Sequence, residues 1–209
     1  MENISAFPLL SLGADIIDYF KKYKKTIIDY TKNNKPTDNE DSSKLKHYHG
    51  EDLSVLNDIS FRDLKDILLE KSTYYYKDVM GYKEDLYISD SWINVCEKGG
   101  YQSDHYHANC VVSGTLFVNL GKDFSPLVFK NPRTTNYPLC SHIRSQSDKE
   151  TLYNLDYMSV KNFEEGHILL WPSYIVHGYK DNKFDQRTSL SFNLNIKSSG
   201  YLYHYGVKR

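Results

Sequence analysis

Residues 187–196 read RTSLSFNLNI, a stretch in which polar and apolar side chains alternate. Successive side chains of a β-strand point to opposite faces, so the alternation predicts a strand with one polar and one apolar face. A guanidinium on an inward polar face is costly unless an anion meets it, and a serine two residues later could donate a hydrogen bond to the same anion. The polar face carries Arg187, Ser189, Ser191 and Asn193, and the other face carries Thr188, Leu190, Phe192 and Leu194.

From Leu86 onward, the chain contains further short segments that are rich in β-branched and aromatic residues and separated by turn-forming residues. This composition is typical of β-strands. Many short strands preceded by helices predict a mainly β protein, a sandwich or barrel backed by N-terminal helices. The segments are LYISDSWINVCEKGG (86–100), YQSDHYHANCVVSGTLFVNLG (101–121), SPLVFKNP (125–132) and GHILLWPS (166–173).

Two segments before residue 86 show helical periodicity. In residues 14–32, apolar side chains recur at helical spacing from Ile16 onward, which predicts a first helix. Residues 60–80 predict a second helix, with Ser60 as its N-cap.

Two long polar segments interrupt these elements. Residues 33–52 are rich in turn formers and predict an exposed loop, so we expect His47 and His49 of its KHYHG sequence (46–50) to face solvent. Residues 131–165 form a second polar segment, of a length that in compact domains is often functional. His142 and His167 are expected to be surface or structural residues, and Arg133 and Arg144 are expected to be solvated loop residues, with contact to a substrate as the alternative.

A second His-Tyr-His lies in DHYHA (104–108), within a segment that predicts a strand. There His105 and His107 would point to the same face, where two imidazoles can bind one metal ion. Two histidines lining an ordinary polar cleft would look the same in sequence. His177 follows a predicted strand and turn, ten positions before Arg187, and adds a third imidazole near the predicted anion site.

The bulk properties fit a soluble globular protein with one core. The chain has 209 residues and a net charge of −1, so its bulk charge gives no indication of nucleic-acid binding. Its first residues do not read as a signal peptide and no apolar run reaches membrane-spanning length. The cysteines are odd in number and irregularly spaced, which fits a reducing, cytoplasmic location: Cys96, Cys110 and Cys140.

Between residues 88 and 193, the order and spacing of several motifs resemble the iron(II)- and 2-oxoglutarate-dependent oxygenases, in particular a branch found among phages and bacteria. The motifs are SWINV, HYH followed by VVSGTLFVN, PLVFKNP, EGHILLWPSYIVHGY and RTSLSFN. The resemblance implies a double-stranded β-helix, the jelly-roll barrel also found in cupins. On this basis we expect a single domain with an N-terminal helical support region (1–85), a jelly-roll catalytic core (86–197) and a C-terminal tail (198–209).

The resemblance also implies a site. His105 and His177 would bind Fe(II), and Arg187 with Ser189 would bind the far carboxylate of 2-oxoglutarate. The family's usual carboxylate ligand is replaced here by His107, which we expect to be the third metal ligand. Asp104 is an alternative ligand, although in a regular strand its side chain points to the opposite face.

Further expectations concern inward-facing residues. Trp92 and Asn94 share the inner face of their strand, and Asn94 and Ser113 could each contact the co-substrate or serve only in packing or a turn. The implied reaction uses 2-oxoglutarate and O2 to hydroxylate an unidentified substrate, with formation of succinate and CO2. The alternatives are a cupin-type metal dioxygenase that does not use 2-oxoglutarate, which three histidines would suit, and an inactive jelly-roll binding or structural protein. The oligomeric state and the substrate class do not follow from the sequence.

Overall fold

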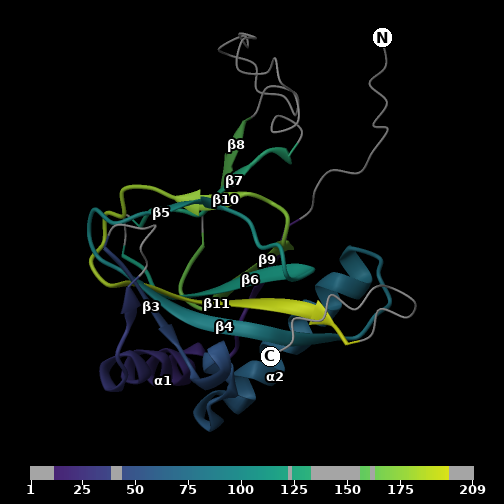
Figure 1. Ribbon diagram of the computed structural model, residues 1–209, viewed down its shortest axis with the longest axis horizontal. Coiled ribbons are helices and arrows are strands. Elements are labelled where there is room, and N and C mark those ends of the chain that lie inside the picture. The colour runs from purple at the N-terminus through teal and green to yellow at the C-terminus, as the bar shows by residue number, and fades with distance from the viewer. Residues whose placement is uncertain (1–11, 39–43, 122–123, 133–155, 161–162, 198–209) are drawn as a thin grey trace.

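The protein consists of two facing antiparallel β-sheets, with helices on the outer side of the larger sheet (Figure 1). The structure, a computed structural model, describes residues 12–38, 44–121, 124–132, 156–160 and 163–197. The larger sheet has the order β1 (Gly13–Ile16), β9 (His167–Pro172), β6 (Val112–Asn119), β11 (Arg187–Ile196), β4 (Leu86–Cys96), β3 (Leu45–His49) and β2 (Thr37–Asp38). The smaller sheet has the order β5 (Gln102–His105), β10 (His177–Tyr179), β7 (Val128–Lys130) and β8 (Tyr157–Ser159).

The chain crosses repeatedly between the two sheets. From β4 onward, β4, β6, β9 and β11 lie in the larger sheet, and β5, β7, β8 and β10 lie in the smaller one. Eight strands wound in this way form a jelly roll. The predicted double-stranded β-helix is therefore confirmed.

Strand β11 lies at the centre of the larger sheet, between β4 and β6. Its apolar face packs with the N-terminal helices in one hydrophobic core, in which Leu190, Phe192 and Leu194 have no solvent exposure. A Cβ atom added to Gly114 on β6 would lie 2.5 Å from Cζ of Phe192, so only glycine lets the phenyl ring cross this strand. The polar face of β11 points to the space between the sheets, as the alternation predicts.

The helices that cover the outer face are α1 (Phe20–Asn33) and α2 (Arg62–Tyr74). The prediction of a helix from residue 14 was wrong at its start, because residues 13–16 form β1 and pair with β9. Tyr19 adopts a left-handed conformation with φ 55° and separates the strand from α1. At Ile16, pairing of β1 with β9 therefore determines the backbone conformation, although the apolar residues there follow a helical spacing.

Short helical turns flank α2. They are the 3-10 turns η1 (Glu51–Leu53), η2 (Val55–Asn57) and η3 (Ile59–Phe61), and the π-helical turn η4 (Tyr75–Val79). The second helix is found where it was predicted, but Ser60 is not its N-cap. Instead, Oδ1 of Asp58 accepts a hydrogen bond from the backbone N–H of Ser60 at 2.8 Å, so the cap lies one short turn earlier in the chain.

The first His-Tyr-His corrects a second prediction, because it lies in strand β3 and not in an exposed loop. His47 pairs with Asn94 of β4, and His49 pairs with Trp92. Directly paired residues share one face of a sheet, so both imidazoles lie on the face that also carries Ser189. Burial lowers the pKa of His47 to about 4, with smaller contributions from its neighbours His49 and His105.

Some predictions fall on residues whose structure is not described. Arg133, Cys140, His142 and Arg144 lie outside the described residues. Within the predicted polar segment 131–165, the described part contains strand β8, which its polar sequence did not suggest. Among the described helices, none combines the length and apolar character needed to cross a membrane.

Candidate metal and co-substrate site

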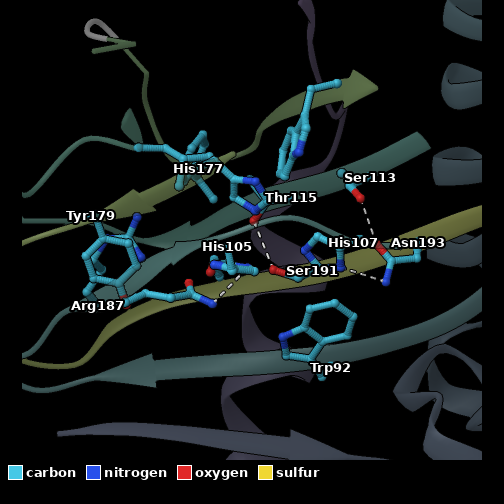
Figure 2. A pocket seen from close by; sticks show the side chains of 16 residues that line it. Trp92, His105, His107, Ser113, Thr115, His177, Tyr179, Arg187, Ser191 and Asn193 are labelled. Carbon is cyan, nitrogen blue, oxygen red and sulfur yellow. Dashed lines mark hydrogen bonds between the residues drawn. The ribbon is translucent and has the colours of Figure 1, made fainter. Parts of the chain in front are cut away.

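Three histidines meet between the two sheets (Figure 2). His105 ends β5 and pairs directly with His177, which begins β10. His107 follows β5, and its backbone N–H donates to the carbonyl of Ser173 at 3.0 Å. One ring nitrogen from each histidine lies within 4.8 Å of the other two, so the three side chains could hold a single metal ion.

The histidine cluster favours the neutral, metal-binding form of the imidazoles. Burial lowers the pKa of His177 to about 3 and that of His107 to about 4, with a further contribution in each case from the nearby His105. Desolvation disfavours the imidazolium cation, and a neutral imidazole has one nitrogen lone pair free for a metal. Near neutral pH, the site therefore needs no proton removal from a cationic histidine before it can bind a metal.

Two of the three histidines also have a defined tautomer. Nδ1 of His105 lies 2.9 Å from the carbonyl oxygen of Ser103, and Nδ1 of His177 lies 2.9 Å from that of Ile175. A carbonyl oxygen can only accept, so each Nδ1 must carry the proton and donate it. This leaves Nε2 of both histidines with its lone pair, as in metal sites in which the second ring nitrogen orients the ligand.

His107 has a different partner. Its Nδ1 lies 3.1 Å from the amide Nδ2 of Asn193 on β11. The same amide nitrogen donates to Oδ2 of Asp90 at 2.7 Å, and the amide oxygen accepts from the hydroxyl of Ser113 at 2.9 Å. The predicted inward position of Ser113 is thus correct, and its hydroxyl contacts the residue behind His107.

Arg187 opens β11 at the other end of the same cavity. Its side chain is 2% exposed, yet Nε has no hydrogen-bond partner among the described residues. The guanidinium lies over the ring of Tyr179, with Cζ 4.0 Å from the ring centroid, and the Tyr179 hydroxyl likewise lacks a partner within the described chain. The unpaired Nε–H of Arg187 and the Tyr179 hydroxyl form a site that is complementary to a carboxylate.

Ser189 and Asn94 lie on neighbouring strands beside Arg187. Ser189 lines the cavity and is 4% exposed. The amide of Asn94 is already engaged, because Nδ2 donates to the hydroxyl of Ser191 at 2.9 Å and Oδ1 accepts from Nε1 of Trp92 at 3.1 Å. In this structure, Asn94 therefore ties neighbouring side chains together.

The structure brings five predicted residues to the lining of one cavity: His105, His107, His177, Arg187 and Ser189. Asp104 is exposed and lies outside the histidine cluster. Sequence reasoning missed Tyr179, although its position two residues after His177 places it on the same face of β10 and could have identified it. Trp92 is a further neighbour of the cluster, where its ring stacks on His107 with centroids 5.8 Å apart.

The residues present suit a divalent transition metal and a dicarboxylate. Neutral imidazoles bind iron, copper, nickel and zinc, and a guanidinium binds a carboxylate through two parallel hydrogen bonds. The apolar part of the cavity wall separates this chemistry from bulk water, and it includes Phe117, Leu127 and Trp171.

The chain is similar in fold to several solved protein structures. HygX from Streptomyces hygroscopicus, with nickel, 2-oxoglutarate and hygromycin B bound, is 10% identical with a TM-score of 0.61, over 90% of this chain and 84% of that one. The epimerase SnoN with Fe3+, alpha ketoglutarate and nogalamycin RO is 10% identical with a TM-score of 0.64, over 90% and 79%. A Pseudomonas putida prolyl-4-hydroxylase is 8% identical with a TM-score of 0.61, over 90% and 94%.

Sequence comparison gives the family. No curated protein matches the chain significantly. A family model described as "Putative 2OG-Fe(II) oxygenase" matches residues 90–193, which run from Asp90 to Asn193 and include the three histidines and Arg187. The chain therefore belongs to the 2OG-Fe(II) oxygenases.

Proposed function

We propose that this protein is an Fe(II)- and 2-oxoglutarate-dependent dioxygenase that hydroxylates a substrate with formation of succinate and CO2. The observation that carries the proposal is the pairing of a neutral histidine cluster with a buried arginine that has no anionic partner among the described residues. His105, His107 and His177 would hold the metal ion. Arg187 would hold the co-substrate at the far end of the same cavity.

Each residue has a distinct task in this proposal. His105 and His177 present Nε2 lone pairs, because backbone carbonyls hold the proton on Nδ1. Arg187 and Tyr179 offer hydrogen-bond donors to the distal carboxylate of 2-oxoglutarate, and Ser189 adds a hydroxyl from the same strand as Arg187. When bound, the iron and 2-oxoglutarate supply the activation of dioxygen and the oxidative decarboxylation.

Turnover of the purified protein tests this function. The protein is loaded with Fe(II) without oxygen, mixed with 2-oxoglutarate and then exposed to air, and succinate is quantified with and without candidate substrates. We expect succinate above the protein-free control, and we expect His177→Ala to reduce it to the control level. The matched control is His167→Ala, because His167 hydrogen-bonds to the backbone of Glu164 at the outer end of β9 and should leave turnover unchanged.

The histidine ligand set favours one second candidate, a cupin-type dioxygenase that does not use 2-oxoglutarate. Three imidazoles would suit such an enzyme, whereas it would have no use for the buried Arg187. Dioxygen consumption that needs Fe(II) and the histidines but not 2-oxoglutarate would support this candidate and refute the proposal. Loss of consumption on omitting 2-oxoglutarate would support the proposal.

A further inference from the structure

The three histidines of the cluster do not carry their protons in the same place. In His105 and His177, Nδ1 faces a carbonyl oxygen and must donate. In His107, Nδ1 faces the amide nitrogen of Asn193 at 3.1 Å. An amide N–H2 group can only donate, so Nδ1 of His107 must accept and the proton of the neutral ring is on Nε2.

Asp90 decides which way the amide of Asn193 points. Oδ2 of the Asp90 carboxylate lies 2.7 Å from Nδ2 of Asn193, and Oδ1 accepts from the hydroxyl of Ser89 at 2.6 Å. If the amide were turned around, two oxygen acceptors would face each other at that distance. The hydroxyl of Ser113, which donates to the amide oxygen, holds the other end of Asn193.

Stacking hinders rotation of the His107 ring away from Asn193. It is stacked between Trp92, with an interplanar angle of 24°, and His177, with an angle of 8°. Its backbone N–H donates to the carbonyl oxygen of Ser173, directly after β9. The proton position of His107 is therefore set by its partner Asn193 and not by reorientation of the ring.

We propose that Asp90, acting through Asn193, is a positioning pair that holds the proton of His107 on Nε2 in the metal-free protein. An incoming metal ion then meets two lone pairs, on His105 and His177, and one N–H group. His107 becomes the third ligand only when its proton moves from Nε2 to Nδ1 and Asn193 turns its amide oxygen to accept it. That turn breaks the hydrogen bond to Asp90, so the pair weakens metal binding. The inference on metal loading rests on the proposed metal site, whereas the proton position does not.

An exchange of the two side chains tests the inference. The double variant Asp90→Asn/Asn193→Asp keeps the size of both side chains and the net charge. The carboxylate at position 193 would accept from Nδ1–H of His107 and from the amide at position 90, so Nε2 would become free. Long-range proton–nitrogen NMR of histidine rings in the metal-free protein reads the proton position directly, with the signals of His107 identified by their loss in His107→Gln.

In the wild-type protein, we expect the non-protonated nitrogen to be Nδ1 in His107 and Nε2 in both His105 and His177. In the exchanged variant, we expect the non-protonated nitrogen of His107 to be Nε2, as in His105 and His177. We also expect the affinity for Zn(II), measured by competition with a chelator, to rise at least about tenfold. A wild-type His107 protonated on Nδ1 would overturn the inference, whether or not the protein turns over 2-oxoglutarate. An exchanged variant that switches its tautomer without tighter Zn(II) binding would overturn the role in metal loading.

If the double variant does not fold, the single variant Asp90→Asn takes its place. It removes the carboxylate that orients Asn193, and we expect a mixture of the two His107 tautomers. A spectrum that is unchanged from wild type would show that Asp90 does not control the proton. Because these measurements need no iron and no turnover, a failure of the proposed oxygenase function would be recognised separately.

Discussion

Replacement of Arg187 by methionine should have opposite effects on two quantities. It should stabilise the metal-free fold and weaken the binding of 2-oxoglutarate. The guanidinium is 2% exposed, and Nε has no hydrogen-bond partner in the described part of the chain. Without an anion it destabilises the fold, so we expect Arg187→Met to raise the unfolding free energy of the metal-free protein by about 1 kcal/mol or more. For a chain of this size, that corresponds to about 2–4 °C in Tm for each kcal/mol.

The same substitution should abolish the response to the co-substrate. Removing one partner of a buried, hydrogen-bonded charge pair costs about 2–5 kcal/mol, and about 3 kcal/mol weakens binding roughly a hundredfold. At a 2-oxoglutarate concentration near 100 times Kd, the wild-type protein would gain about 2.7 kcal/mol of stability and the variant less than about 0.5 kcal/mol. Thermal unfolding of Ni(II)-loaded protein, with and without 2-oxoglutarate, measures both effects.

Tyr179→Phe is the matched control for Arg187→Met, because it keeps the aromatic ring under the guanidinium and removes only the hydroxyl. We expect it to weaken 2-oxoglutarate binding by about tenfold, as for one hydrogen bond to a charged group. The reasoning is refuted if Arg187→Met responds to 2-oxoglutarate as wild type does. It is also refuted if the metal-free variant is less stable than wild type, since the arginine would then be satisfied by the protein itself.

Two further predictions concern the histidine cluster. In the folded protein, burial lowers the pKa of His107 to about 4 and that of His177 to about 3, whereas an unfolded histidine titrates near 6.5. The unfolded chain thus binds more protons between these pH values, and urea unfolding of the metal-free protein should show stability falling as the pH is lowered from about 6.5 towards 4. Gly178→Ala should weaken Zn(II) binding by about tenfold or more, because its Cβ would lie 2.8 Å from the carbonyl oxygen of Gln102 and push β5 away from β10. Unchanged Zn(II) affinity would mean that the spacing of these two strands does not set the cluster.

The sequence predicts the central strand well because both faces of β11 are constrained. Its apolar face is buried under the helices, and its polar face lines the site, so strict alternation is needed along the whole strand. Strand β3 has no such pattern, since its inward residues His47 and His49 are polar and lie beside the polar part of the interior. A polar strand near the edge of a sheet, facing a polar interior, therefore has the composition of a loop.

The N-terminal strand was missed for a different reason. Ile16 and Ile17 continue the spacing of the helix that follows, and a pattern of apolar residues does not show where the backbone leaves one conformation for another. In the structure, Ile17 is buried and Ile16 is 49% exposed, as expected when neighbouring side chains of an extended segment point to opposite faces. The left-handed Tyr19, a conformation that a bulky aromatic residue seldom adopts, marks the boundary.

The two His-Tyr-His tripeptides show why a metal site depends on strands that are distant in the sequence. Both lie in strands or at strand ends, and both present their imidazoles to the interior of the barrel. What distinguishes them is the residue on the neighbouring strand of the same sheet: His105 is paired in register with His177, more than seventy positions later, whereas His47 is paired with Asn94. Because an amide beside His47 is no metal ligand, and the histidine cluster found among the described residues contains His105 and His107, strand register favours the second tripeptide as the proposed metal site. The first is left as a neutral imidazole pair behind Trp92, the residue on which His107 stacks.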